Sequence, residues 1–305
     1  MDFSALLIKM FVFAVLLTVG YGMSRKGLLS REFIKGASTL LLNVFITASV
    51  INSVLGARPQ MDTRQLLRTL LILTLLEVAI YVFAWICSIP ARKQGRGNQP
   101  ELIMAITNSL FIGLPVVQAI SGSEAVFYVG LSCIPFNLIL YTYGVWRFCQ
   151  GKGESKLSLR DIVSIPLIAS AVSLLIFILN PPVPRLLQDL FSTVGTGTVP
   201  LSMIIIGANL GKTNPVKAFG DGKLWLISLE RLIICPVILF FVMRLFTDNL
   251  PLLLSCTVLA GCPVGTIITP LSIQYGHDAE YASESVMVST ILCMFTLPLL
   301  LKILF

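Results

Sequence analysis

The chain has 305 residues, of which 56% are hydrophobic and only 12% are charged, and its formal net charge is +7. Soluble domains carry about 25% charged residues, so this composition excludes an ordinary soluble enzyme or binding domain. A basic chain could bind nucleic acid, but here the basic residues lie in short connections between apolar blocks. We therefore expect no nucleic-acid partner.

The apolar residues form blocks of about 20 residues, the length of a helix that crosses a hydrocarbon core of ~30 Å. We therefore predict an all-α integral membrane protein with ten transmembrane helices, surrounded by membrane lipids. The first block precedes Arg25 and Lys26 and is followed by no small-residue cleavage site, so we expect a retained helix rather than a secretory signal. The predicted spans are 3–23, 33–55, 66–89, 101–121, 124–147, 161–180, 186–210, 222–246, 250–275 and 279–304.

Basic residues are concentrated in the connections that follow the odd-numbered spans. The positive-inside rule predicts that these connections are cytoplasmic, so both termini of this multi-pass protein of the cell membrane are expected outside the cytoplasm. The connections after spans 1, 3, 5 and 7 contain Arg25, Lys26, Arg31, Arg92, Lys93, Arg96, Arg147, Lys152, Lys156, Arg160, Lys212, Lys217 and Lys223, whereas the opposite connections contain Arg58, Arg64, Arg185 and Arg244.

Ten spans divide into two groups of five, residues 1–147 and 161–305, joined by a cytoplasmic linker at 148–160. Because five is odd, a repeated unit would enter the membrane in the opposite orientation the second time. Inverted repeats of this kind are typical of secondary transporters. A weak repeat is visible, since spans 3 and 8 carry Glu77 and Glu230, and spans 4 and 9 each carry a Gly-x-Pro motif.

The two motifs, Gly113-Leu114-Pro115 and Gly261-Cys262-Pro263, are predicted to interrupt spans 4 and 9 near the middle of the membrane. Proline removes a backbone donor and glycine adds backbone freedom. An unpaired backbone group costs several kcal/mol in hydrocarbon, so an interruption requires polar surroundings. Exposed N–H groups then favour an anion and exposed C=O groups a cation. We expect the interruptions to meet and form a solute site; simple proline kinks are the alternative.

Neutral polar side chains flank these motifs, Asn108 in span 4 and Thr266 in span 9, and span 5 contributes Asn137. Such donors and acceptors are suited to holding a polar solute. Hydrogen bonds between helices, worth about 0.6–2 kcal/mol each, explain them equally well.

Charged residues within the spans are few, and an ionisable group inside a membrane is a candidate for function. Glu77 lies near the middle of span 3 and could carry a coupling proton. Glu230 and Arg231 are adjacent and would point about 100° apart on a helix. We therefore expect them to pair with neighbouring helices, or Arg231 to attract an anion, rather than to pair with each other.

The seven cysteines are scattered without a metal-binding or redox spacing, and the single histidine, His277, has no catalytic partner nearby in the sequence. Small packing residues explain the cysteines. We expect no catalytic residue, metal site or cofactor, and hence no enzyme, other than a coupling H⁺ or Na⁺.

Several strings resemble the auxin efflux carrier family, in particular its bacterial branch, which is related to plant auxin carriers and bacterial malate and malonate permeases. They are Asn108-Ser-Leu-Phe-Ile-Gly113-Leu-Pro115, Gly261-Cys-Pro263-Val-Gly265-Thr266, Gln274-Tyr275-Gly276, Val288-Ser289-Thr290 and Thr296-Leu-Pro298. The chain departs from the family pattern at Ile46-Thr47-Ala48, where a proline is common, and it lacks the long central loop of many plant members.

The resemblance implies two inverted five-helix repeats with crossed, broken helices 4 and 9, as in bile-acid symporters and some sodium/proton antiporters. It implies a scaffold domain of spans 1, 2, 6 and 7 and a transport domain of spans 3–5 and 8–10 that moves like an elevator. A homodimer is compatible with it. By position, it places Asn108, Gly113, Pro115, Asn137, Pro263, Gly265 and Thr266 around the substrate.

We therefore predict a secondary active transporter of a small organic anion, a carboxylate by the resemblance, driven by a proton or sodium gradient or by membrane potential. A non-transporting receptor or sensor that binds a ligand at the crossover is one alternative, but no output module is visible in the sequence. A sodium/proton antiporter is another, although spans 4, 5 and 9 contain no mid-membrane Asp or Glu. A channel is less favoured, because no filter motif is present.

Overall fold

The computed structural model describes residues 3–55, 61–93, 97–150 and 165–305, and within them the secondary structure is helical apart from one isolated β-bridge. Two shorter apolar helices, Ile165–Leu179 and Leu250–Gly261, accompany seven longer ones. In the described residues, an all-α fold with helices long and apolar enough to cross a membrane is therefore confirmed. The seven stretches long and apolar enough to cross a membrane are Leu7–Arg25, Arg31–Leu55, Thr63–Cys87, Ser109–Cys149, Arg185–Leu210, Gly222–Arg244 and Ala279–Leu304.

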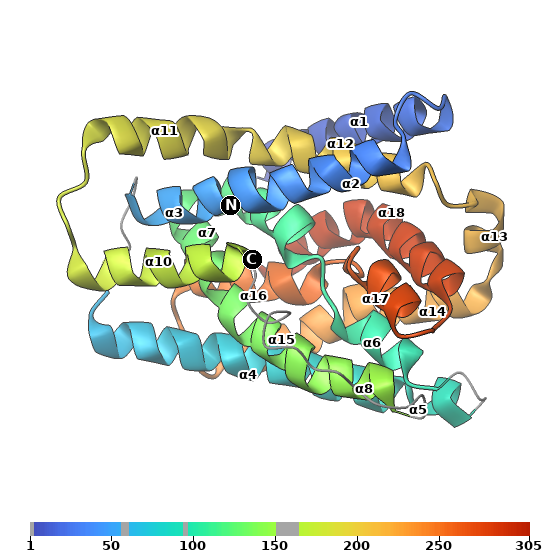
Figure 1. Ribbon diagram of the computed structural model, residues 1–305. Helices are drawn as coiled ribbons and strands as arrows, with labels where there is room; N and C mark the ends of the chain where they lie inside the picture. The colour runs from blue at the N-terminus through green and yellow to red at the C-terminus, as the bar shows by residue number, and fades with distance from the viewer. Residues whose placement is uncertain (1–2, 56–60, 94–96, 151–164) are drawn as a thin grey trace.

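The helices are labelled in Figure 1. The π-helical turns η1 (Leu41–Ile46), η3 (Ser109–Gly113), η4 (Leu140–Gly144) and η5 (Glu230–Ile234) continue directly into α-helices. The α-helices are α1 (Phe3–Arg25), α2 (Arg31–Leu40), α3 (Thr47–Leu55), α4 (Thr63–Cys87), α5 (Ile89–Ala91), α6 (Gln99–Ala105), α7 (Leu114–Ile139), α8 (Val145–Cys149), α10 (Ile165–Leu179), α11 (Arg185–Thr196), α12 (Thr198–Leu210), α13 (Pro215–Gly220), α14 (Gly222–Leu229), α15 (Cys235–Arg244), α16 (Leu250–Gly261), α17 (Ile268–Gln274) and α18 (Ala279–Leu304).

The longest helical stretch, Ser109–Cys149, is divided at Gly122. This glycine has φ 70° and ψ −153°, which is not helical. A positive φ of this kind is readily adopted only by glycine. The division falls between the predicted spans 101–121 and 124–147. The stretch Ser109–Cys149 therefore consists of two separate helices.

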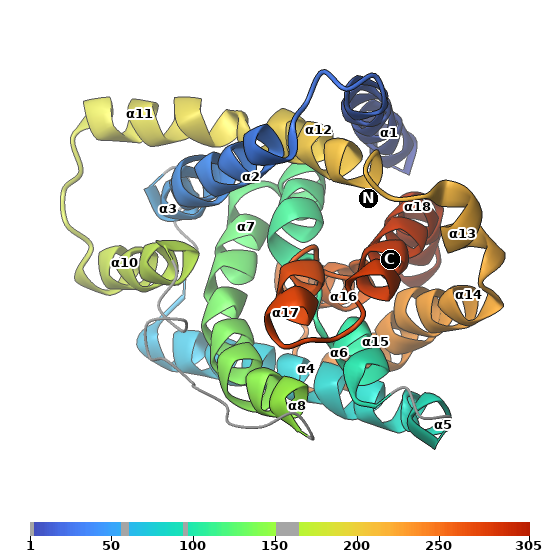
Figure 2. The same ribbon diagram turned by 45° about the vertical axis from the view of Figure 1, so that its right-hand side comes forward.

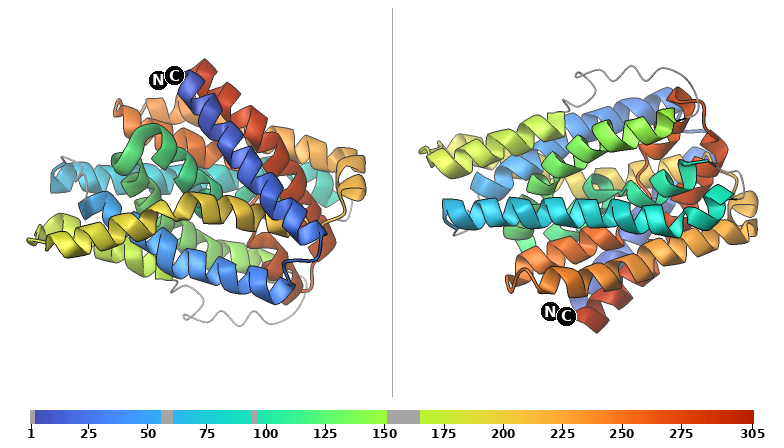
Figure 3. Two further views of the ribbon diagram at one scale, coloured as in Figure 1. Left: turned by 90° about the horizontal axis from the view of Figure 1, so that it is seen from above. Right: turned by 90° about the horizontal axis from the view of Figure 1, so that it is seen from below.

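Helix α1 packs along α12 and also contacts α18 (Figure 2). A Cβ on Gly20 or Gly207 would come within about 2 Å of the backbone of the facing helix. In both views of Figure 3 the beginning of α1 and the end of α18 lie side by side. The two ends of the described chain are therefore at the same end of the helix bundle.

The connections after the odd-numbered spans gather at the other end of the bundle, which we call the basic end. Lys212 donates from Nζ to the Leu29 carbonyl at 2.8 Å, and Asn98 donates from Nδ2 to the Arg147 carbonyl at 3.2 Å. Further contacts that join these connections include Gln99 Nε2 with the Asp278 carbonyl at 2.6 Å, His277 Nε2 with the Phe148 carbonyl at 2.8 Å, and Lys217 Nζ with Glu280 Oε1 at 2.8 Å.

Some of the predicted features lie outside the described residues. These are 151–160 of the predicted linker at 148–160, residues 161–164 of the predicted span 161–180, and the basic residues Arg58, Arg96, Lys152, Lys156 and Arg160.

Candidate functional site

Two interrupted helices meet inside the bundle, where Thr107 and Val264 form an antiparallel β-bridge. One interruption separates α6 from η3, and the other separates α16 from α17 (Figure 2). The Asn108 N–H donates to the Pro263 carbonyl at 2.9 Å, and the Gly265 N–H donates to the Ile106 carbonyl at 2.9 Å. The two breaks therefore pair backbone groups that hydrocarbon could not satisfy. We call this the crossover.

The interruption in span 4 does not lie at Gly113-Leu114-Pro115, where we predicted it. The backbone leaves helical geometry between Ile106 (ψ 112°) and Asn108 (ψ 52°), and Pro115 lies inside a helix that begins at Ser109. Proline is accommodated because it follows η3, in which the Leu114 N–H bonds back to the Ser109 carbonyl. Such a π-turn is wider than an α-turn and relieves the clash of the proline ring with the preceding turn.

The interruption in span 9 lies where the sequence predicts it, from Cys262 to Ile267 around Pro263. The Val264 N–H, which has no helical partner there, donates to Ser289 Oγ of α18 at 3.1 Å. The sequence did not single out Ser289 as a site residue, because a hydroxyl on one helix does not reveal which backbone group it reaches on another. The only signal for Ser289 in the sequence was its place in the string Val288-Ser289-Thr290, which resembles the family.

A cavity of about 730 Å³ lies beside the crossover and opens at the basic end. Of the predicted site residues, Asn108, Gly265 and Thr266 line it. The opposite wall comes from α2 with η1 and from α12. The cavity is also lined by Arg31, Ile34, Lys35, Leu42, Thr107, Phe111, Phe136, Asn209, Lys212 and Glu280.

The mouth of the cavity carries an excess of positive charge. Arg31, Lys35 and Lys212 are all exposed there, whereas the acidic residue on the rim, Glu280, is paired with Lys217 at 2.8 Å. The hydrogen bond to Glu280 raises the pKa of the Lys217 ammonium, so this lysine stays protonated near neutral pH. Clefts lined by charge of one sign concentrate ligands of the opposite sign. The mouth therefore favours an anion.

Deeper in the cavity, two buried polar groups of the crossover lack protein partners. Asn108 is 3% exposed, and its Nδ2 donates to no other described residue; the same holds for Thr107 Oγ1. A buried donor left unpaired costs about 1–3 kcal/mol. Asn108 also precedes the helix that begins at Ser109, and the N-terminus of a helix carries partial positive charge. An acceptor or an anion in the cavity would therefore satisfy both the amide of Asn108 and this helix end.

The other predicted substrate residues do not line the cavity. Gly113 and Pro263 lie at the crossing itself, where a Cβ on Gly113 would be 2.9 Å from Cys262 Sγ. Asn137 is buried and donates from Nδ2 to the Cys133 carbonyl at 2.7 Å. Pro115 is buried within its helix. The structure thus brings three of the seven residues to the cavity and assigns two of the others to the packing of the crossing.

The charged residues predicted within spans 3 and 8 lie behind the crossover and do not line the cavity. Glu77 and Arg231 are fully buried, and neither carboxylate oxygen of Glu77 has a hydrogen-bond partner among the described residues. Glu230 is partly exposed, so the adjacent pair points in different directions as expected. Arg231 donates from Nη1 to the Ala260 carbonyl at 3.1 Å, close to the interruption in span 9.

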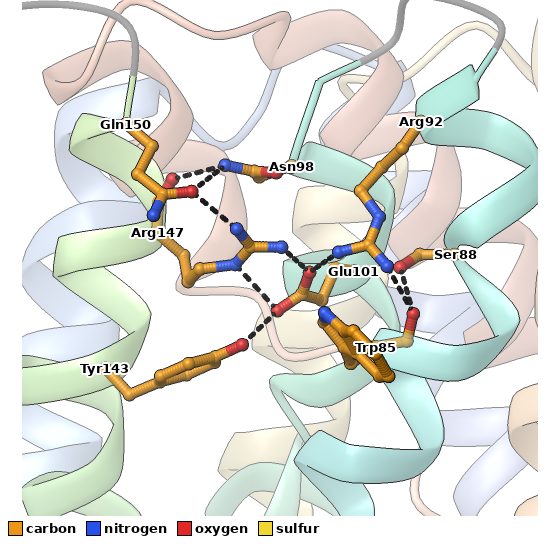
Figure 4. A network of polar contacts seen from close by, with 8 residues as sticks. All are labelled: Trp85, Ser88, Arg92, Asn98, Glu101, Tyr143, Arg147 and Gln150. Carbon is orange, nitrogen blue, oxygen red and sulfur yellow. Dashed lines mark hydrogen bonds and ion pairs between the residues drawn. The ribbon is translucent and has the colours of Figure 1, made fainter.

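A buried carboxylate at the basic end, Glu101, was not singled out by the sequence analysis (Figure 4). It lies on α6 at 0% exposure and accepts from Arg92 Nη1 at 2.8 Å, Arg147 Nε at 2.9 Å and the Tyr143 hydroxyl at 2.7 Å, with a further contact from Arg147 Nη2. Arg92 also donates to the Trp85 carbonyl at 2.7 Å. The cluster fixes α6, which leads into the crossover, to the ends of α4 and α8.

Comparison with known proteins agrees with this architecture. A family model described as a membrane transport protein matches residues 5–301. The chain is also 25% identical, over 294 residues, to an uncharacterized transporter of Methanothermobacter thermautotrophicus, an alignment that covers 93% of this chain and 94% of the relative. These findings confirm the resemblance to auxin efflux carriers seen in the sequence. The chain belongs to the membrane transport protein family.

Proposed function

We propose that the protein is a secondary active transporter of a small organic anion, a carboxylate in the first instance, across the cell membrane. The observation that supports this most directly is the cavity beside the crossover. It combines an unpaired, buried Asn108 amide with a basic mouth formed by Arg31, Lys35 and Lys212. A ligand that fits both features has an anionic head group and enters from the basic end.

In this proposal the anionic group of the substrate accepts from Asn108 Nδ2 and from Thr107 Oγ1, while Gly265 and Thr266 form the adjoining wall. The side chains of Phe111, Phe136 and Ile34 offer an apolar surface to the rest of the molecule. Binding sites of this kind, mostly apolar with a few placed polar groups, are typical of small-molecule ligands.

The proposed architecture has ten spans in two inverted repeats, 1–147 and 161–305. Dividing Ser109–Cys149 at Gly122 and adding the helices Ile165–Leu179 and Leu250–Gly261 supports this number. We assign spans 1, 2, 6 and 7 to a scaffold and spans 3–5 and 8–10 to a moving transport domain. The cavity supports an elevator-type motion, since one wall comes from α2 and α12 and the other from the crossover, α17 and α18.

The basic end is assigned to the cytoplasm by the positive-inside rule, with both termini on the far side. The cavity in this structure then opens to the cytoplasm. A proton on Glu77, Na⁺ at exposed backbone carbonyls, or the membrane potential itself would couple substrate movement to a gradient. A homodimer through the scaffold fits the same proposal. We propose no catalytic activity and no cofactor beyond the coupling ion.

The experiment is transport by the purified protein in proteoliposomes, with a panel of labelled carboxylates and imposed pH, Na⁺ or potential gradients. Asn108→Ala should lower uptake about 10–100-fold, the effect of losing a hydrogen bond to a charged group worth about 1.5–3 kcal/mol. Asn43→Ala is the matched control, because Asn43 is a partly buried amide of η1 that does not line the cavity.

Both variants should insert into the membrane and unfold at the temperature of the unmodified protein. Loss of folding in Asn108→Ala would favour a packing role for this residue. Saturable binding of a carboxylate without any transport, under every gradient, would contradict the proposal and favour a receptor.

A further inference from the structure

The C-terminal end of α16 lies at the crossover and presents carbonyl groups there. The last four carbonyls of an α-helix lack partners within the helix, and the helix end carries a partial negative charge equivalent to about half an electron. Inside a membrane these groups need a donor or a cation. The helix has twelve residues, from Leu250 to Gly261, so its end dipole is well developed.

Protein side chains already satisfy this helix end. Arg231 donates from Nη1 to the Ala260 carbonyl at 3.1 Å, and Cys293 Sγ of α18 contacts the Gly261 carbonyl at 3.7 Å. The Leu259 carbonyl accepts from the Cys262 N–H at 3.4 Å. Three successive carbonyls next to the break are thus bonded within the protein, and one of the donors carries a full positive charge.

The position of Arg231 is built into the fold in two ways. It lies in the π-turn η5, in which the Cys235 N–H bonds back to the Glu230 carbonyl, and this wider turn changes the direction of the side chain relative to a regular helix. It is also 0% exposed and is the largest of the fully buried side chains. A buried guanidinium remains charged, because arginine does not lose its proton in proteins.

A buried cation is stable only if negative charge compensates it. The negative end of α16 supplies it at the Ala260 carbonyl, and Glu77 on α4, which is itself fully buried, attracts Arg231 electrostatically without a hydrogen bond between the two side chains. Neither Arg231 nor Glu77 lines the solute cavity. The arginine therefore compensates the broken helix from behind and does not compete for the substrate.

We propose that Arg231 is a permanent internal cation at the carbonyl end of α16, in the position that a bound monovalent cation would otherwise take. The crossover then needs no sodium ion at this helix end. As far as transport is concerned, this inference rests on the proposed function. It removes Na⁺ at the α16 carbonyls from the coupling schemes and leaves the proton and the membrane potential.

The test measures thermal unfolding of the purified protein and does not depend on transport. The unmodified protein should unfold at the same temperature in NaCl, KCl and choline chloride of equal ionic strength. Arg231→Ala should unfold at a lower temperature, and millimolar methylguanidinium should raise that temperature by refilling the vacated position. Arg244→Ala, which removes an exposed guanidinium from the other end of α15, should show no such rescue.

A saturable stabilisation of the unmodified protein by Na⁺ but not by K⁺ or choline would overturn the proposal. So would an equal effect of methylguanidinium on the unmodified protein and on Arg231→Ala. If Arg231→Ala does not fold, two measurements still test the proposal. One is the unfolding of Arg231→Lys, which keeps the positive charge, and the other is the sodium titration of the unmodified protein. If proteoliposomes show no transport at all, the proposed function fails while these unfolding results stand or fall separately.

Discussion

Gly207 of α12 lies directly against the backbone of Leu17 in α1, so that a Cβ on residue 207 would be 1.9 Å from the Leu17 carbonyl oxygen. Gly20 of α1 makes the reciprocal contact, with a Cβ that would be 2.0 Å from the Ile204 carbonyl oxygen. Helices in lipid gain little from hydrophobic burial against each other, and small residues let their backbones approach closely. This contact joins the first span to the seventh.

Gly207→Ala should destabilise the protein, because the added methyl group meets backbone that cannot move aside; overpacking of this kind costs about 1–3 kcal/mol. Gly22→Ala is the matched control on α1, since a Cβ there would meet nothing within 4 Å. Alanine is the better helix former by about 1 kcal/mol, so the control should be neutral or stabilising. Thermal unfolding in detergent distinguishes the two, and equal unfolding temperatures would contradict the packing described here.

Gly113 and Cys262 offer a compensating pair at the crossing. Gly113→Ala should lower the unfolding temperature, because its Cβ would be 2.9 Å from Cys262 Sγ. Adding Cys262→Ala removes that sulfur and should restore much of the loss. Gly265→Ala should not be rescued in this way, because its Cβ would be 2.9 Å from the backbone oxygen of Thr107. If Cys262→Ala rescued Gly265→Ala, or failed to rescue Gly113→Ala, the close contact of Gly113 with Cys262 Sγ would be contradicted.

The cluster around Glu101 should be sensitive to which partner is removed. Glu101→Gln leaves two guanidinium groups without their carboxylate, and breaking a buried ion pair costs about 3–5 kcal/mol. Arg92→Gln should have a smaller effect, because the side chain is 19% exposed and Arg147 continues to pair with Glu101. The double variant Glu101→Gln with Arg147→Gln should lose less stability than the two single losses together. Denaturation midpoints measure this, and strict additivity would mean that the pair is not coupled.

Glu77 is expected to carry the coupling proton of the proposed transporter. Glu77→Gln keeps the size of the side chain but cannot exchange a proton, so transport should lose its dependence on pH. The measurement is initial uptake into proteoliposomes at a series of pH values with the membrane potential clamped. The conservative variant Glu77→Asp should retain a pH dependence. An unchanged profile in Glu77→Gln would remove this residue from the coupling mechanism.

The sequence predicted the meeting of spans 4 and 9 and the boundary near Gly122, because glycine and proline leave local signals. It misplaced the interruption in span 4. The residues that leave helical geometry, Ile106 to Asn108, include neither glycine nor proline, and they are held open by bonds to Pro263 and Gly265 far along the chain. Local sequence cannot show such a partner, and a π-turn removes the disruption expected from Pro115.

The polar clusters were harder to predict. Glu101 lies at the start of an apolar block, and its partners Arg92 and Arg147 lie in connections that the sequence analysis used only as markers of orientation. The bond from Arg231 to the Ala260 carbonyl was equally hidden, because it depends on the direction that η5 gives to the side chain. Residue type and spacing indicate that such charges matter, while their partners are set by the packing of helices.

The main-chain bonds between Ile106, Asn108, Pro263 and Gly265 have a thermodynamic consequence for a transporter. They tie both sides of the cavity wall at the crossover into one unit, so Asn108 and Thr266 should stay together if the surrounding helices shift. The intrinsic affinity for a solute can then stay the same on both sides of the membrane. Net flux would be decided by the concentrations and charges on either side, and not by a site that is tight on one face and loose on the other.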